Sequence, residues 1–172
     1  EWKQEKDALI LDAERNQWLA SFIGNLADTQ GNTLVLVSSV KQGKAIQKAI
    51  GDDSVFLYGQ DSEAVRREMY DSFETNNNIK LIANVQIAGT GLSINRIFNV
   101  VLVDVGKAFT RVLQTIGRGL RLSHDKSHVD VYDIGSNYSF GAGHAIKRQK
   151  YYNEAEYKFS TARVNFRALP TT

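Results

Sequence analysis

Hydrophobic positions along the chain follow two different periods. From about residue 13 to residue 28, apolar side chains recur every three or four residues with polar residues between them, which is typical of an amphipathic helix. The next apolar run, TLVLVSSV at 33–40, is nearly unbroken and rich in β-branched residues, as in a strand that is covered on both faces. The intervening Gln30-Gly31-Asn32 predicts the end of the helix.

This alternation continues along the rest of the chain and predicts a parallel sheet covered by helices on both faces. Asp61 or Ser62 is a natural N-cap for one of these helices, and Glu63 suits its positive end. The expected strands after the first are 55–59, 80–84, 99–105 and 128–134, and the expected helices are 41–50, 61–76, 110–121 and 142–159.

Composition narrows the class of protein without naming it. The 172 residues, 42% of them hydrophobic, suffice for one domain with its own core. A net charge of +2 permits nucleic acid as a partner without indicating it. The absence of cysteine excludes disulfides and thiolate chemistry, and the apolar runs are far shorter than the roughly 20 residues that cross a bilayer. We therefore expect a cytoplasmic domain, and the start without methionine suggests a piece of a longer protein.

Ligands of open α/β sheets bind beyond the carboxyl ends of the strands, so the segments that follow strands are the first place to look. Gly89 and Gly91 flank Thr90 at one such point and permit a close approach of the backbone to a ligand. An isolated G-x-G is more often only a turn. Neither QGKA at 42–45 nor GTGLS at 89–93 matches the P-loop pattern, so the chain has no obvious triphosphate cradle of its own.

The segment QTIGRGLR places three polar side chains on one face of a helix. Gln114, Arg118 and Arg121 are separated by steps of four and three, and two glycines between them cost about 1 kcal/mol each relative to alanine. Two guanidinium groups suit a phosphoryl group that gains charge, and glutamine can orient a water. A solvated basic face is the alternative interpretation. The glutamine, the glycines and the position after a strand favour the anion site.

These residues resemble a known family. QTIGRGLR is similar to motif VI of superfamily 2 helicases, Q-x-x-G-R-x-x-R, and AGTGLSIN at 88–95 is similar to their motif V, in the right order and at the right separation. TLVLVSSVKQGKAI resembles the motif IV strand and helix, and the stretch 57–84 resembles the segment that precedes motif V. The likeness covers roughly residues 30 to 135, and within the superfamily it is greatest to phage branched-DNA helicases.

The resemblance implies a three-layer RecA-like, P-loop-NTPase-like fold that forms the second motor domain of an ATP-dependent DNA helicase used in recombination or repair. The whole chain would be one domain, with a helical lead-in at 1–29, a motif-bearing core at 30–135 and a helical extension at 136–172. ATP and Mg²⁺ would be held mainly by a first RecA-like domain, which is absent from this chain. The 172 residues alone should then be nearly inactive as an ATPase.

The resemblance also implies roles for individual residues. Arg118 and Arg121 would be arginine fingers that reach the γ-phosphate, with Gln114 beside them as a further catalytic group. Gly89 and Gly91 would let the motif V loop approach the nucleotide. Ser93 stands where many relatives have aspartate, so its expected contact with ribose, or its coupling of the ATP and DNA sites, stays open.

DNA would lie across the carboxyl ends of the strands and be contacted mainly at its phosphates. RNA is a further possible partner. For each candidate taken singly, an ordinary cap or loop residue is an equally good interpretation. The candidate nucleic-acid-binding residues are Ser38, Ser39, Lys41, Gln42, Gln60, Val85 and Gln86.

Two other sets of residues favour structural roles. The helix 142–159 interleaves basic and aromatic residues, which can stack on bases, but tyrosines docked on the sheet with lysines in water are the preferred interpretation. Asp104 and Asp133 end strands, and motif order makes them structural or positioning groups. The spacing of the three histidines, His124, His128 and His144, does not predict a zinc site.

Two rival functions remain at this point. The first is a nucleic-acid-binding or partner-docking RecA-like domain without chemistry, against which the intact Gln114, Arg118 and Arg121 argue. The second is a duplex-DNA translocase of the restriction or remodelling type that moves without unwinding.

Overall fold

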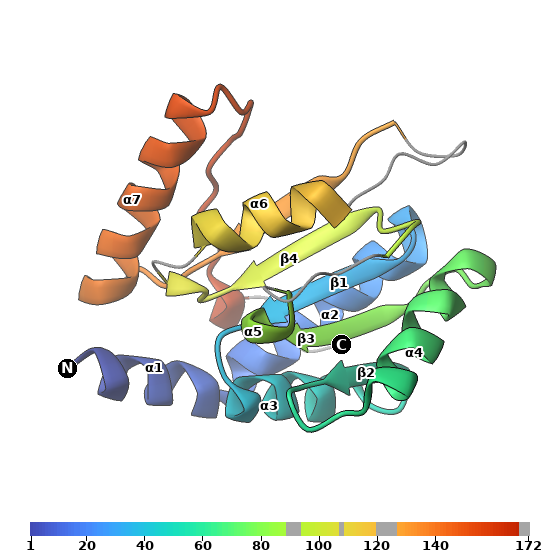
Figure 1. Ribbon diagram of the computed structural model, residues 1–172. Helices are drawn as coiled ribbons and strands as arrows, with labels where there is room; N and C mark the ends of the chain where they lie inside the picture. Colours follow the sequence, from blue (N-terminus) through green and yellow to red (C-terminus); the bar gives the residue numbers. More distant parts are fainter. Residues whose placement is uncertain (89–93, 107–108, 120–126, 169–172) are drawn as a thin grey trace.

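A five-stranded parallel sheet forms the centre of the computed structural model, which describes residues 1–88, 94–106, 109–119 and 127–168 (Figure 1). The strand order is β2-β3-β1-β4-β5, and all four pairs are parallel. The α/β fold with a parallel sheet is therefore confirmed. The strands are β1 (Thr33–Val37), β2 (Ser54–Leu57), β3 (Lys80–Asn84), β4 (Asn99–Val103) and β5 (Asp130–Ile134).

Helices precede, connect and follow the strands. They are α1 (Trp2–Leu11), α2 (Ala13–Gln30), α3 (Val40–Ile50), α4 (Glu63–Thr75), α5 (Val85–Ala88), α6 (Phe109–Gly119) and α7 (Ser139–Glu154), followed by a short 3₁₀ turn, η2 (Phe166–Ala168). Within the described ranges, none of these helices combines the length and the apolar character that crossing a bilayer requires.

Local signals explain most of the helix boundaries. Ser62 is the N-cap of α4, where its side chain accepts a hydrogen bond from the backbone of Val65. Gly31 ends α2 with φ +101°, a conformation that favours glycine, and its N–H bonds the carbonyl of Ala27. The predicted strand 33–40 is too long, because Ser39 is already the N-cap of α3.

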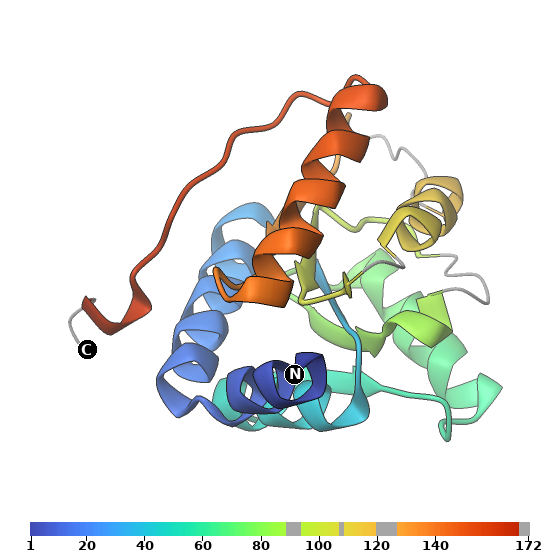
Figure 2. The same ribbon diagram turned by 90° about the vertical axis from the view of Figure 1, so that its left-hand side faces the viewer.

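The last predicted helix is displaced along the chain. We expected 142–159, whereas α7 runs from Ser139 to Glu154. Glu156 adopts a left-handed conformation with φ +58°, which stops the helix. The chain then runs as an extended tail to η2, where Arg167 bonds the carboxylates of Asp12 and Glu14 at the start of α2 (Figure 2).

Alternating side chains of the central strands fill two cores, one on each face of the sheet. Leu34 and Leu36 of β1 belong to a cluster with residues of α4, α5 and α6, whereas Val35 and Val37 belong to a cluster with residues of α2 and α3. All four of these β1 side chains are fully buried. This is the three-layer arrangement seen in Figure 1.

All five strands end along one side of the sheet, the carboxyl edge, which consists of the segments that follow Val37, Leu57, Asn84, Val103 and Ile134. Figure 2 looks onto this edge, with α1 and α7 in front. Glu5 of α1 accepts hydrogen bonds from the backbone N–H groups of Phe140 and Gly141 at the start of α7. A carboxylate at the positive end of a helix is stabilising, so this contact holds α1 against the edge.

Candidate functional site

Helix α6 carries the central residues of the predicted nucleotide site. Gln114 and Arg118 both lie on α6, one turn apart, which places them on the same side of the helix. Gln114 is exposed. The side chain of Arg118 and the whole of Arg121 lie outside the part of the chain that the structure describes, as do Gly89, Gly91 and Ser93.

The apolar side of α6, which faces away from Gln114, holds the helix in place by packing. Phe109 and Val112 are buried against the sheet. The ring of Phe109 meets the rings of Tyr151 and Tyr152 of α7 edge-on, at centroid distances of 5.2 and 5.8 Å. Helix α5 contacts α6 as well. The sheet, α5 and α7 therefore support α6 on its apolar side and leave Gln114 in solvent.

The connection from β1 to α3 brings three of the nucleic-acid candidates to the carboxyl edge. Ser38 and Ser39 are half-buried, and the Ser39 hydroxyl accepts a hydrogen bond from the N–H of Gln42. Lys41 is exposed, with Nζ 3.5 Å from a carboxylate oxygen of Asp7 in α1. The positive end of the α3 dipole points the same way, so this segment suits an anion such as a phosphate.

The turn after β2 presents Gln60 in a fixed conformation. The N–H of Tyr58 donates to the carboxylate of Asp61 at 2.6 Å, and the N–H of Asp61 donates to the carbonyl of Tyr58 at 3.0 Å. The guanidinium of Arg66 donates to the carbonyls of Gly59 and Asp61. Sequence reasoning did not assign Arg66 this role, because the bond depends on where the turn lies over α4.

Val85 and Gln86 begin α5, directly after β3. Val85 packs partly into the core beside α6, whereas Gln86 is exposed and its N–H donates to the side-chain oxygen of Asn84 at 2.9 Å. Gln86 is therefore the more accessible of the two at the carboxyl edge. Its neighbour Val85 can offer a ligand little beyond its backbone.

Gln42 requires a correction, because its side chain does not reach the surface. It is 1% exposed and points inward, where Nε2 donates to Asp104 Oδ2 at 2.9 Å and Oε1 accepts from the N–H of Ser38 at 3.3 Å. A buried amide with both ends occupied is not free to bind a phosphate. We therefore remove Gln42 from the set of surface contacts.

Asp104 is the centre of the buried network that captures Gln42. Arg15 of α2 approaches both of its carboxylate oxygens, Nη1 to Oδ2 at 2.9 Å and Nη2 to Oδ1 at 3.0 Å. Asp104 also takes φ +49°, which aspartate and asparagine tolerate better than most residues. The structure thus places Asp104 as a structural group, as motif order predicted, and adds Arg15, which no local pattern distinguishes from a surface arginine.

Asp133 is the second-last residue of β5, opposite Leu102 of β4. Its Oδ2 accepts from Nε of Arg148 at 2.6 Å and from the hydroxyl of Tyr152 at 2.8 Å. Burial, reinforced by the Asp133 charge, raises the pKa of Tyr152 well above its ordinary value of 10.0. Lys147 and Lys150 are exposed while Tyr151 and Tyr152 pack on the core, which confirms the docked-helix interpretation of α7. Arg148, by contrast, is 2% exposed.

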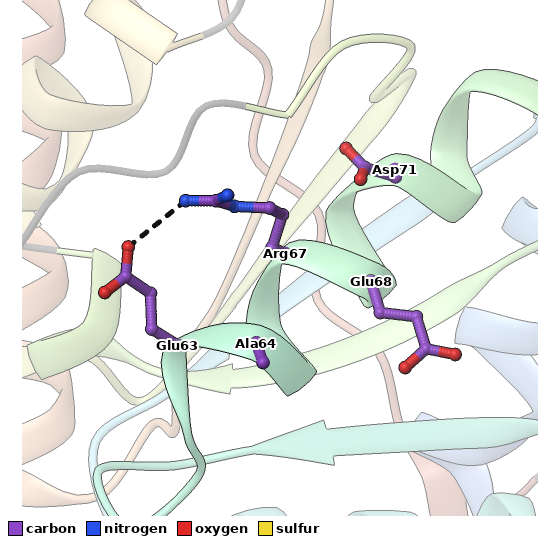
Figure 3. A pocket seen from close by; sticks show the side chains of 5 residues that line it. All are labelled: Glu63, Ala64, Arg67, Glu68 and Asp71. Atoms are coloured by element: carbon purple, nitrogen blue, oxygen red, sulfur yellow. Dashed lines mark hydrogen bonds and ion pairs between the residues drawn. The ribbon is translucent and has the colours of Figure 1, made fainter.

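A shallow hollow lies over the outer face of α4, and none of the predicted site residues lines it. It is lined by Glu63, Ala64, Arg67, Glu68 and Asp71, and Arg67 pairs with Glu63 at 3.4 Å (Figure 3). Three carboxylates and one guanidinium disfavour a phosphate ligand. Shape alone therefore does not mark the functional site of this domain. Within the described residues, no three His, Asp or Glu side chains are grouped so that they could hold a metal ion.

The chain is similar in sequence to known proteins. The model of the family described as the helicase conserved C-terminal domain matches residues 14–123. The ATP-dependent DNA helicase uvsW of Enterobacteria phage T4 is 30% identical over 142 residues, which are 81% of this chain and 28% of that protein. The chain thus spans little more than a quarter of the length of this relative.

Solved structures show the same fold. The crystal structure of T4 UvsW superimposes with a TM-score of 0.78 at 19% identity, over 96% of this chain and 37% of that one. The C-terminal domain of the DEAD-box protein Dbp5 gives a TM-score of 0.58 at 19% identity, over 83% of this chain and 81% of that one. The sequence match, together with the RecA-like fold, shows that this chain belongs to the helicase conserved C-terminal domain family and is related to the UvsW DNA helicase.

Proposed function

We propose that this chain is the C-terminal motor domain of an ATP-dependent DNA helicase that acts in recombination or repair. The exposure of Gln114 on α6, opposite the buried Phe109 and Val112, is the observation that carries the proposal. A motif helix anchored on its apolar side presents its polar side to a partner, here a preceding RecA-like domain with bound ATP. The DNA helicase activity named for the phage relative supports the same assignment.

The chemistry of the available donors fits a nucleotide phosphate. Gln114 and Arg118 lie on one side of α6, and Arg121 continues the same spacing. In this proposal the two guanidinium groups stabilise charge that develops on the γ-phosphoryl oxygens, and the amide orients the attacking water. Mg²⁺, held mainly by the first RecA-like domain, would further neutralise the phosphate charge. In the same proposal, Gly89 and Gly91 would let the motif V segment approach the nucleotide, and Ser93 would contact the ribose or couple the ATP and DNA sites.

Nucleic acid binds along the carboxyl edge in the same proposal. Lys41, Gln60 and Gln86 are exposed there, and Ser38 and Ser39 add half-buried hydroxyl groups. Contacts of this kind bind phosphates, so affinity depends strongly on salt and little on sequence. Stepwise closure of the two domains around ATP then moves the protein along the strand.

The test measures DNA-stimulated ATP hydrolysis by the full-length protein that contains this chain. Arg118→Ala and Arg121→Ala are compared with Arg163→Ala, a change at an exposed arginine of the tail. The two motif variants should lose about 10³-fold or more in turnover, as for arginine fingers, while nucleotide and DNA binding persist. Arg163→Ala should retain wild-type turnover.

Other outcomes identify other functions. Unchanged turnover in both motif variants contradicts the finger assignment and favours the domain without chemistry. ATP-driven movement on duplex without strand displacement on forked DNA identifies a translocase. Strand displacement on forked RNA in place of forked DNA changes the substrate.

A further inference from the structure

One buried amide connects two parts of the carboxyl edge that the proposed function assigns to different ligands. Gln42 lies in the first turn of α3, next to Lys41, and its side chain crosses to Asp104 at the end of β4. The nucleic-acid candidates Ser38, Ser39 and Lys41 are thus within one hydrogen bond, or one residue, of Gln42.

The nucleic-acid end of this connection is tightly defined. Gln42 Oε1 accepts from the N–H of Ser38 at 3.3 Å, and the N–H of Gln42 donates to the hydroxyl of Ser39 at 3.2 Å. A shift of the backbone at 38–41 must therefore displace the Gln42 amide or break these bonds. Both serines are only half-buried, so a ligand can reach the segment from outside.

The other end leads to α6. Asp104 lies five residues before Phe109, and Asp104 and Gly106 both have left-handed backbone conformations, with φ +49° and φ +66°. Two left-handed residues separated by a single position, Val105, make a defined turn after β4, and the position of this turn depends on what holds Asp104. The Asp104 carboxylate is held by Gln42 and by both terminal nitrogens of Arg15.

Burial limits the arrangements that the hydrogen bond between Gln42 and Asp104 can adopt. Gln42 is 1% exposed and Asp104 is 6% exposed, so water cannot readily replace a lost hydrogen bond. The network then has few alternative arrangements, and displacement at one end favours displacement at the other. Such discrete, packed arrangements carry coupling between two sites.

We propose that Gln42 is a positioning residue that couples nucleic-acid binding at 38–41 to the placement of α6. This inference rests on the proposed function and deepens it, because it assigns the stimulation of ATP hydrolysis by nucleic acid to a specific hydrogen bond. Gln42 itself contacts neither ligand. Its effect passes through Asp104 to the helix that carries Gln114 and Arg118.

The test uses the full-length protein and Gln42→Leu. This change replaces the buried amide with an apolar side chain of similar size, so the hydrogen bonds are lost and the space stays filled. Gln42→Met is a second variant in case the first does not fold. Gln47→Leu is the matched control, since Gln47 lies on the same helix and makes one hydrogen bond, to the carbonyl of Ser54, away from Asp104. The quantity measured is turnover at saturating single-stranded DNA divided by turnover without DNA.

This ratio should fall about tenfold in the Gln42 variants, within the usual range of coupling between sites, while the Kd for DNA changes less than threefold. Gln47→Leu should keep the wild-type ratio. An unchanged ratio in the Gln42 variants, an equal fall in Gln47→Leu, or a parallel loss of DNA affinity overturns the proposal.

Hydrogen exchange separates this proposal from the proposed function. DNA should change the protection of the α6 amides in the wild-type protein but not in Gln42→Leu. If the wild type shows this change without any ATP hydrolysis, the proposed function fails and the coupling stands. If DNA does not alter α6 in the wild type, the coupling is overturned even where DNA stimulates hydrolysis.

Discussion

Arg15 and Asp104, 89 positions apart in the sequence, form a two-point ion pair with nitrogen–oxygen distances of 2.9 and 3.0 Å. Their side chains are only 5% and 3% exposed. The pair joins the middle layer of the domain to α2 at the point where the chain leaves β4. Because both charges are buried, each depends on the other, and the turn depends on the pair.

Removing one partner should therefore destabilise the domain strongly. Among the described residues, Arg15→Met leaves Gln42 as the one side-chain donor to a buried carboxylate, and we expect the free energy of unfolding to fall by about 3–5 kcal/mol. Asp104→Asn added to Arg15→Met should recover part of this loss, because the amide carries no charge and asparagine tolerates the left-handed backbone. Urea denaturation of the three proteins measures both effects. Equal stability of Arg15→Met and the wild type would mean that the pair is not formed in solution.

Two glycines in helices should respond to alanine in opposite directions. A Cβ at Gly43 of α3 would lie 2.4 Å from ring carbons of Phe56, whereas at Gly24 of α2 it meets nothing within 4 Å. Gly43→Ala must displace the Phe56 ring or α3, so we expect a loss of about 1–3 kcal/mol. Gly24→Ala should gain up to about 1 kcal/mol from helix propensity. Thermal unfolding of both variants tests the packing, and a gain at both positions contradicts it.

The hydroxyl of Tyr152 should make stability depend on alkaline pH. Burial raises its pKa in the folded protein above the ordinary value of 10.0, so the folded state holds the proton more tightly than the unfolded chain. The stabilisation is complete below about pH 10 and is lost as pH rises from there towards the higher folded pKa.

Tyr152→Phe isolates this effect. At about pH 8 the variant should be less stable by about 0.5–1.5 kcal/mol, because the hydrogen bond to Asp133 is gone. The deficit should shrink at about pH 11, where the wild type has begun to lose its advantage. Urea denaturation at both pH values gives the two differences, and a deficit that grows with pH reverses the assigned direction.

Lys41 and Lys48 should contribute unequally to nucleic-acid binding. Both are exposed residues of α3, but Lys41 lies at the carboxyl edge and Lys48 in the last turn. The ion pair between Lys41 and Asp7 is exposed, so breaking it costs little free energy. Lys41→Ala should weaken binding of single-stranded DNA and reduce the salt slope of log K by about 1, as for the loss of one phosphate contact.

Lys48→Ala is the matched control for this charge change. Its affinity and salt slope, measured by fluorescence anisotropy at several salt concentrations, should equal those of the wild type. Equal losses at both positions would indicate a diffuse effect of net charge rather than a binding edge.

Local sequence determined most elements of this fold, although α1 as a separate helix and α5 were not predicted. Unbroken apolar runs became strands, periodic segments became helices, and Gly31 and Ser62 set their ends through backbone conformation and side-chain capping. These signals are local because each depends on a few neighbouring residues. The spacing of Gln114, Arg118 and Arg121 belongs to the same class, and their roles in catalysis remain a proposal.

Tertiary structure decided where the polar side chains point. Gln42 and Arg148 are of residue types that usually lie at the surface. Both are nevertheless buried, because Asp104 and Asp133 accept their hydrogen bonds. Glu5 similarly accepts hydrogen bonds from the start of α7, 135 positions away. A charged or amide side chain is stable in either solvent or the interior, and only a partner brought close by the folded chain decides between them.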